Sequence, residues 1–307
     1  MVNKKHLIVI GGPTASGKTD LAIRLAQHFT TDILSADSRQ FYREMTIGTA
    51  KPTEEELALV KHHFINNLSI HDNYSVGDFE KDAIAVLQKL FETKDVVIMV
   101  GGTGLYIKAV CEGLDVFPDT PLSIRQDFEA LMTENGLEYL QNLLKEVDFE
   151  YFSEVDIDNP KRVIRALSVW KASGQPFSSF RKGEQVNRFF TPQYICLDVQ
   201  RPLLYERINS RVDKMVAEGL VAEAKELHPF KHLNALQTVG YSELFDYFEG
   251  TLSLSVALDK IKQHTRNYAK RQVTWFKKED YWQHFNPSDF DKIISSLERP
   301  CSGDFSR

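Results

Sequence analysis

A glycine-rich loop between an apolar run and a helix constrains the fold of this 307-residue chain most strongly. The segment Gly12–Thr19 reads GPTASGKT and matches the pattern G-x-x-x-x-G-K-[ST] at every fixed position. It directly follows the apolar run His6–Gly11, and it precedes Asp20–His28, whose apolar residues recur at helical spacing. Between a strand and a helix, this pattern is typical of a phosphate-binding loop. We therefore predict that the chain binds a diphosphate or a triphosphate.

The residue types of this loop suit phosphate binding for separate physical reasons. Glycines let the backbone curl so that successive N–H groups converge on phosphate oxygens, and the helix N-terminus adds its dipole. Lys18 supplies a positive charge for the terminal phosphate, and the Thr19 hydroxyl is the expected ligand of a Mg²⁺ cofactor. The predicted diphosphate- or nucleotide-binding residues are Gly12, Pro13, Thr14, Ala15, Ser16, Gly17, Lys18 and Thr19.

Strand and helix signals alternate along the first hundred residues. Short apolar runs at residues 32–36 and 95–100 are typical of buried parallel strands, and residues 78–91 have helical spacing. This alternation predicts βαβ units. We therefore expect an α/β fold of the P-loop NTPase type, a parallel sheet with helices on both faces.

The pattern changes after residue 114. The following segment has helical periodicity and no buried-strand signal until Tyr194–Val199, after which long helices are predicted to the end. The sequence thus predicts a core domain of residues 1–114 and 191–307, with a helical C-terminal region. A helical insertion domain of residues 115–190 is expected to interrupt this core.

Composition and the lengths of the apolar runs indicate the cellular location of the protein. Its apolar runs are far shorter than the 18 or so residues that cross a bilayer, and Met1 leads into the first strand without a signal-peptide pattern. Three widely spaced cysteines exclude a disulfide framework and a cysteine-based zinc cluster. We therefore predict a cytoplasmic protein with no membrane partner.

The charge distribution is uneven. The formal net charge of −6 argues against a protein that coats nucleic acid non-specifically. Between Lys260 and Lys278, however, there are seven Lys or Arg residues and no Asp or Glu. Because electrostatic footprints are local at physiological salt, this segment is a candidate for binding a polyanion.

Further motifs follow the phosphate loop in a fixed order. DSRQ begins at Asp37, at the end of the second predicted strand, where α/β sheets bind ligands. IGTAKP (47–52), GGTGLY (101–106), NPKRVIRAL (159–167), TVGY (238–241) and YAKRQVTWF (268–276) come after it. Together with the phosphate loop, these segments resemble the tRNA dimethylallyltransferases, also called tRNA isopentenyltransferases, from about residue 8 to residue 278.

The resemblance implies a reaction. Members of this family transfer a dimethylallyl group from dimethylallyl diphosphate to N6 of the adenosine immediately 3′ of the anticodon. The match implies that Asp37 is the general base, that Thr103 lies where the nucleotide meets the donor, and that Lys18 stabilises the departing diphosphate. The implied partners are the tRNA anticodon stem-loop and dimethylallyl diphosphate, and we expect the chain to act as a monomer.

The resemblance also implies that the insertion domain contacts tRNA, and it implies which residues do so. The target base must leave a stacked loop, and such loops are recognised by stacking and phosphate contacts. The implied residues are Asp37, Ser38, Arg39, Gln40, Thr103, Arg125, Lys161, Arg162, Val163, Ile164, Arg165, Arg266, Lys270, Arg271 and Gln272. Trp275, in the same basic segment, is expected to be a structural core residue.

Three alternatives remain open on the sequence. An enzyme that prenylates free adenine nucleotides would share the loop and the base, but it would lack the insertion and the basic segment. In a P-loop kinase, Asp198 would be the metal carboxylate, and Arg201, Arg207 and Arg211 would form a lid. A non-enzymatic tRNA-binding module would not need Asp37.

Overall fold

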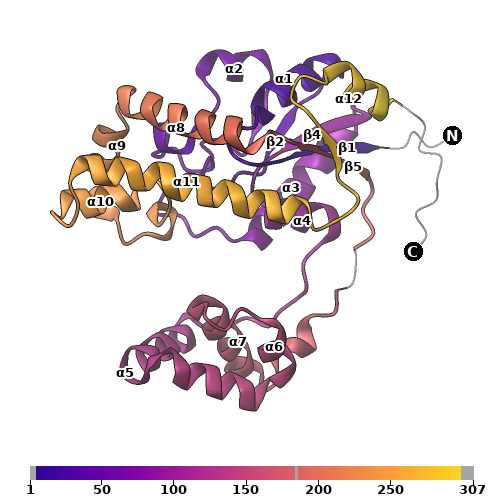
Figure 1. Cartoon of the computed structure of the whole chain (residues 1–307). Helices are drawn as coiled ribbons and strands as arrows, with labels where there is room; N and C mark the ends of the chain where they lie inside the picture. Colours follow the sequence, from indigo (N-terminus) through magenta and orange to yellow (C-terminus); the bar gives the residue numbers. More distant parts are fainter. Residues whose placement is uncertain (1–4, 184–185, 299–307) are drawn as a thin grey trace. The chain divides into compact units, whose positions relative to one another are not determined.

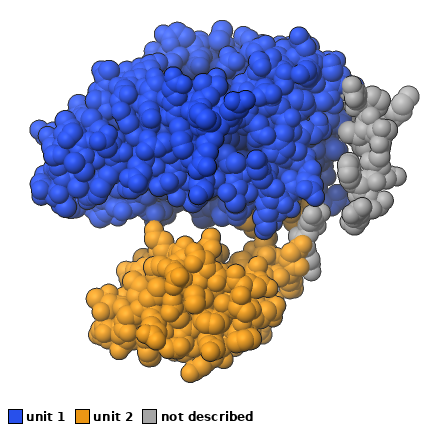
Figure 2. Space-filling model, viewed as in Figure 1, with its two compact units in different colours: residues 1–111, 187–307 blue, residues 112–186 orange. Residues whose placement is uncertain are grey.

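A computed structural model describes residues 5–183 and 186–298 of the chain (Figure 1). The chain divides into two compact units, one of Met1–Cys111 with Asn187–Arg307 and one of Glu112–Val186 (Figure 2). The sequence placed the two boundaries three and four residues further along the chain. Among the described residues, no helix combines the length and the apolar character that crossing a membrane requires.

A six-stranded parallel sheet forms the centre of the larger unit, in the order β3-β2-β4-β1-β5-β6. The strands are β1 (His6–Gly11), β2 (Ile33–Ser35), β3 (His62–His63), β4 (Val96–Val100), β5 (Thr191–Leu197) and β6 (Gln283–Phe285). The pairs Ile10–Val100 and Gly11–Cys196 bring the carboxyl ends of three strands to one edge. This edge is where parallel α/β sheets bind ligands. The predicted α/β fold with a parallel sheet is confirmed.

Helices cover both faces of the sheet because side chains alternate along each strand. Leu7 and Val9 of β1 pack in one apolar cluster with α3 (Val76–Phe91) and α4 (Gly104–Glu112), whereas Ile8 and Ile10 pack in another with α1 (Lys18–His28) and α12 (Phe290–Leu297). The helices of this unit are α1 (Lys18–His28), α2 (Glu54–Leu59), α3 (Val76–Phe91), α4 (Gly104–Glu112), α8 (Arg201–Ala217), α9 (Leu220–Leu227), α10 (Ser242–Phe248), α11 (Leu254–Phe276) and α12 (Phe290–Leu297). Helices α8 to α11 enclose a third cluster around the fully buried Tyr241.

The smaller unit is helical. It contains α5 (Leu122–Val147), α6 (Phe149–Glu154) and α7 (Pro160–Ser173). Leu140 and Leu144 of α5 pack on the apolar face of α7, and Gly136 breaks α5 with a φ of 80°. The unit thus has an apolar core of its own.

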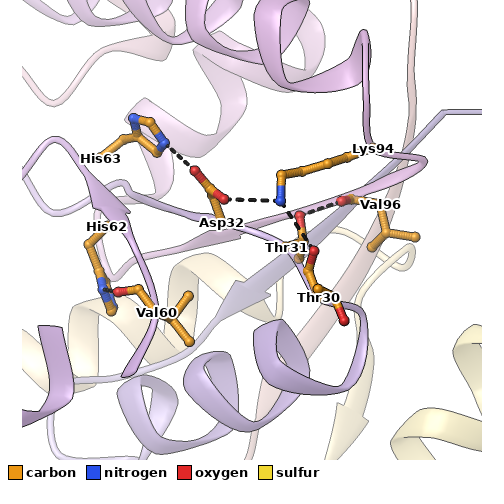
Figure 3. A network of polar contacts seen from close by, with 8 residues as sticks. All are labelled: Thr30, Thr31, Asp32, Val60, His62, His63, Lys94 and Val96. Atoms are coloured by element: carbon orange, nitrogen blue, oxygen red, sulfur yellow. Dashed lines mark hydrogen bonds and ion pairs between the residues drawn. The ribbon is translucent and has the colours of Figure 1, made fainter. Parts of the chain in front are cut away.

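A polar network fixes the amino ends of the strands, away from the phosphate loop (Figure 3). The Asp32 carboxylate, just before β2, contacts His63 Nε2 at 2.9 Å and Lys94 Nζ at 3.2 Å. Partial burial raises the pKa of Asp32, but the hydrogen bonds from His63 and Lys94 outweigh it and lower the pKa below its ordinary value. Asp32 is therefore a structural carboxylate.

Gly101 lies where the carboxyl ends of β2 and β4 meet. A Cβ at Gly101 would stand 2.6 Å from the carbonyl carbon of Ala36, which is backbone and has no room to turn aside. We expect Gly101→Ala to lower the free energy of unfolding by about 1–3 kcal/mol, measured by urea denaturation. Gly104→Ala is the matched control, because its Cβ meets only the side chain of Trp275, which is 43% exposed and can move. Equal losses in the two variants would contradict this explanation.

Candidate active site

A cavity of about 670 Å³ lies at the carboxyl edge of the sheet. The phosphate loop, the segment after β2, residues 48–50, and helices α8 and α11 all contribute to its wall. Of the residues singled out from the sequence, it is lined by Thr14, Asp37, Ser38, Arg39, Thr103, Arg211, Tyr268 and Arg271. Segments far apart in the chain therefore meet in one place.

The phosphate loop has the conformation that a phosphate cradle needs. Gly17 has a φ of 92° and Ala15 a φ of 62°, so the backbone curls before α1 begins at Lys18. The Lys18 ammonium donates a hydrogen bond to the Pro13 carbonyl at 2.7 Å. Burial lowers the pKa of Lys18 to about 8, although the nearby Asp37 carboxylate raises it. A bound phosphate would supply the negative charge that favours the ammonium form.

Gln272 of α11 connects this loop to the loop after β4. Its Oε1 accepts a hydrogen bond from the Thr14 N–H at 2.8 Å, and its Nε2 donates to the Gly102 carbonyl at 2.9 Å. The side chain is buried and both of its polar ends are used. The prediction that Gln272 contacts tRNA is therefore wrong, since this side chain holds two loops of the site together.

Asp37 faces the cavity with a carboxylate that is suited to accept a proton. Its Oδ1 accepts a hydrogen bond from the Arg39 N–H at 3.1 Å. Desolvation raises the pKa of Asp37 above its ordinary value, although this hydrogen bond and the cations Lys18 and Arg211 oppose the rise. A carboxylate with a raised pKa is a better general base near neutral pH than an ordinary aspartate.

Thr103 and Tyr268 form a second polar pair in the cavity. Both residues line its wall, and burial raises the pKa of the Tyr268 hydroxyl to about 12. Asp37 also raises the pKa of Tyr268 by electrostatic repulsion, which places the pair near the candidate base. Thr103 and Asp37 therefore line the same cavity, and the role that the motif match implied for Thr103 stays a prediction.

Arg211 of α8 is part of the site, although the sequence pattern connected it only with the kinase alternative. Its Nη1 donates to the Thr14 hydroxyl at 3.4 Å, and its charge acts on both Lys18 and Asp37. Burial lowers the pKa of Arg211, but a guanidinium remains protonated in proteins. The site thus contains two half-buried cations, Lys18 in the phosphate loop and Arg211 beside it.

Glu223 of α9 holds the loop that contains residues 48–50 of the wall. Its carboxylate accepts hydrogen bonds from the N–H groups of Thr46 at 3.0 Å, Ile47 at 2.8 Å and Gly48 at 2.9 Å. It also accepts one from the Tyr241 hydroxyl at 2.7 Å. Sequence patterns did not single out Glu223, because the residues around it in the sequence form no motif that predicts hydrogen bonds to residues 46–48.

We expect Glu223→Ala to lower the free energy of unfolding by about 2–4 kcal/mol, since it leaves several donors without their charged acceptor. Thermal denaturation would measure the loss. Glu226→Ala removes an exposed carboxylate from the same helix and should change stability by less than about 0.5 kcal/mol. A Glu223→Ala protein as stable as Glu226→Ala would contradict the assignment.

Other predicted tRNA contacts of the larger unit are partly engaged within the protein. The Arg39 guanidinium donates to the carbonyls of Asn234 at 3.1 Å and Ala235 at 2.9 Å. The Gln40 amide contacts the Ser35 hydroxyl and two backbone carbonyls of the 48–50 loop. Arg266 donates to Asn209 at 2.6 Å.

The basic face of α11 is available to solvent. Lys270 and Arg271 are exposed, and the Arg271 guanidinium lies 5.7 Å from the centre of the Tyr268 ring. Trp275 is 43% exposed, so the expectation that it belongs to the core is wrong. It packs against Gly104, where the missing Cβ makes room for the indole.

The predicted RNA contacts of the insertion separate into two groups. Lys161, Arg162 and Arg165 are exposed on α7, as is Arg125 on α5, whose guanidinium pairs with Glu129. Val163 and Ile164 are buried in the core of this unit. The prediction that their side chains contact RNA is wrong, because on a helix they point away from the exposed cations.

The sequence and the fold were compared with known proteins. The model of the IPP transferase family matches residues 40–279. A tRNA dimethylallyltransferase of Flavobacterium johnsoniae is 50% identical over 297 residues, covering 94% of this chain and 96% of that protein. One of Christiangramia forsetii is 51% identical, covering 95% of this chain and 98% of that protein.

Solved structures agree with these relatives. The full-length tRNA isopentenylpyrophosphate transferase of Bacillus halodurans has a TM-score of 0.70 at 36% identity, covering 96% of this chain and 94% of that one. A eukaryotic dimethylallyltransferase, solved in a study of its action on tRNA, has a TM-score of 0.80 at 25% identity, covering 98% and 81%. The family model begins at residue 40, after the phosphate loop and Asp37, whereas the two relatives match 94% and 95% of this chain. This chain belongs to the tRNA dimethylallyltransferase family.

Proposed function

We propose that the protein transfers a dimethylallyl group from dimethylallyl diphosphate to N6 of the adenosine immediately 3′ of the anticodon in tRNA. The observation that carries this proposal is the meeting of the phosphate loop, Arg211 and Asp37 at one cavity. Cations are available on the side where a diphosphate leaves, and a carboxylate is available where a proton must be removed. Family membership supports the same reaction.

The reaction assigns a task to each group. The bond between N6 and the allylic carbon forms while the bond from that carbon to the diphosphate oxygen breaks. Lys18, Arg211 and the loop N–H groups stabilise the charge that develops on the diphosphate. Asp37 accepts the proton that N6 loses, and Thr103, which lines the cavity together with Tyr268, helps position the adenine edge.

We propose Mg²⁺ as the cofactor. The loop offers hard oxygen donors, as Mg²⁺ prefers: the Thr19 hydroxyl and the buried Ser16 hydroxyl, which has no hydrogen-bond partner within the described part of the chain. Thr19 would hold the ion, and a bound Mg²⁺ would neutralise diphosphate charge. Lys18 and Arg211 would share that task from the protein side.

We also propose how the RNA partner is held. The exposed cations of α7 and α11 suit the phosphates of an anticodon stem-loop, and Tyr268 and Trp275 offer partly exposed rings for stacking. The target adenosine would leave its stack to reach Asp37. In this proposal the protein acts as a monomer in the cytoplasm, on tRNA.

A pH profile tests the role of Asp37. Because the carboxylate must be deprotonated to accept the N6 proton, kcat/KM should fall as the pH falls through the pKa of Asp37. Burial raises that pKa, so the acidic limb should lie above the range of an ordinary aspartate. Steady-state rates between about pH 4 and 8 would locate it. An acidic limb at the ordinary aspartate pKa would contradict this role.

One acceptor experiment tests the whole proposal. The protein would be incubated with Mg²⁺, labelled dimethylallyl diphosphate and either an anticodon stem-loop with adenosine after the anticodon or free AMP. We expect label on the stem-loop only. Label on AMP would support the free-nucleotide alternative. No transfer to either, with phosphate transfer from γ-labelled ATP instead, would support a kinase.

A further inference from the structure

A second group of reactive side chains lies at the carboxyl ends of β5 and β6, and none of them lines the cavity described above. Cys196 of β5 is paired with His284 of β6 in the parallel register of these strands. Asp198 follows Cys196 by two residues, so its side chain returns to the same face of the sheet. Strand pairing thus gathers a thiol, a carboxylate and an imidazole.

The spacing of these groups suits one small ion. The Cys196 sulfur, a carboxylate oxygen of Asp198 and a ring nitrogen of His284 all lie within 4.8 Å of one another. The His284 Nδ1 and the Asp198 Oδ2 are 3.1 Å apart. In a tetrahedral zinc site the ligand atoms are about 3.3–3.8 Å apart, given the usual bond lengths. Small side-chain shifts would therefore bring the three atoms onto one ion.

The burial of the three residues defines an inner and an outer side. The Cys196 side chain is buried, whereas those of Asp198 and His284 are 49% and 32% exposed. An ion can therefore enter from solvent past the imidazole and the carboxylate and meet the sulfur behind them. The set of donors is one sulfur, one nitrogen and one oxygen, which zinc-like ions accept and Mg²⁺ does not.

We propose that Cys196, Asp198 and His284 form a binding site for a zinc-class divalent ion, with a fourth position open to water. On binding, the ion replaces the thiol proton, which passes to solvent, and a sulfur–metal bond forms without any change of oxidation state. The site is distinct from the Mg²⁺ site proposed at Thr19, and it does not depend on the proposed transfer reaction.

This site would lie directly behind the phosphate loop. Leu197, between the two β5 ligands, is so near the loop that a Cβ on Gly12 would stand 3.1 Å from its carbonyl oxygen. An ion that joins β5 to β6 therefore stiffens the wall on which the loop rests. Bound metal should consequently raise the thermal stability of the protein.

Cobalt titration of the full chain, after treatment with a chelator and its removal, tests the site. We expect one equivalent of Co²⁺ to produce a thiolate-to-cobalt charge-transfer band that Zn²⁺ abolishes and excess Mg²⁺ does not. Cys196→Ser should lose the band. His284→Ala and Asp198→Asn should raise the dissociation constant at least about tenfold.

Matched variants separate this site from incidental thiol binding. Cys111→Ser changes another buried cysteine of the same apolar cluster, and Cys301→Ser removes the cysteine that lies outside the described residues. Both should keep the band. The proposal is overturned if wild-type protein gives no band, or if Cys196→Ser retains it. If circular dichroism shows that Cys196→Ser does not fold, the test depends on His284→Ala, whose substituted side chain is partly exposed. An unchanged dissociation constant for Co²⁺ in His284→Ala then overturns the proposal.

Discussion

Asp37→Asn is expected to lower the rate of dimethylallyl transfer by about 10²–10⁴-fold, the usual contribution of a positioned general base. The amide has nearly the same shape and can still accept the Arg39 N–H through its oxygen, but it cannot take a proton from N6. Tight binding of the stem-loop should remain. Single-turnover rates with labelled donor, beside a binding measurement, would separate the two effects.

Asp32→Asn is the matched control for this change. Asp32 and Asp37 flank the same strand, β2, but Asp32 belongs to the network with His63 and Lys94 at the far end of the sheet (Figure 3). Asp32→Asn should lower the free energy of unfolding and leave the transfer rate within about threefold of wild type. Equal losses of rate in the two variants would mean that Asp37 acts through the fold rather than on the proton.

The parts of the fold that the sequence predicted are those with a local signal. β1, β2 and β4 are short apolar runs buried on both faces, and each lies within one residue of its predicted range. β3 and β6 were missed because two- and three-residue edge strands carry no hydrophobic run. β5 begins three residues before the predicted start, because pairing of His6 with Thr191 extends the ladder.

In the candidate site, too, the residues that the sequence predicted are those with a local signal. The phosphate loop and Asp37 could be found because their chemistry depends on neighbours in sequence. Arg211 and Glu223 act on residues about 170 to 200 positions away, so no local pattern assigns them to the site. Gln272 was assigned to tRNA from its basic surroundings, and only the packing of α11 shows that it faces inward.

Periodicity explains the errors in the insertion. NPKRVIRAL combines a basic and an apolar stripe, and the family resemblance predicted RNA contacts for residues of both. Helical geometry assigns Lys161, Arg162 and Arg165 to the surface, and it turns Val163 and Ile164 inward. Trp275 is the opposite case, an apolar residue that was expected in the core but is 43% exposed and packs against Gly104, a residue far away in the sequence.

The second large effect is expected at Arg211. Arg211→Met removes one of the two half-buried cations at the phosphate loop, which in the proposed reaction stabilise the negative charge on the departing diphosphate. Loss of one such donor lowers kcat by about 10²–10³-fold. Arg211→Lys should fall between wild type and Arg211→Met, because it keeps the charge but loses the forked geometry. Rates at saturating donor and stem-loop would measure both.

Arg207→Met is the control for charge, since Arg207 is exposed one helical turn earlier on α8. It should leave kcat nearly unchanged. If Arg211 only held the Thr14 side chain, Thr14→Val would reproduce the loss in Arg211→Met. If the charge of Arg211 stabilises the leaving diphosphate, Thr14→Val should keep most of the rate. The ratio of the wild-type rate to the Arg211→Met rate should then increase with donor analogues whose leaving group departs more slowly. A ratio that does not depend on the leaving group would contradict this role, because charge stabilisation matters most when departure of the diphosphate limits the rate.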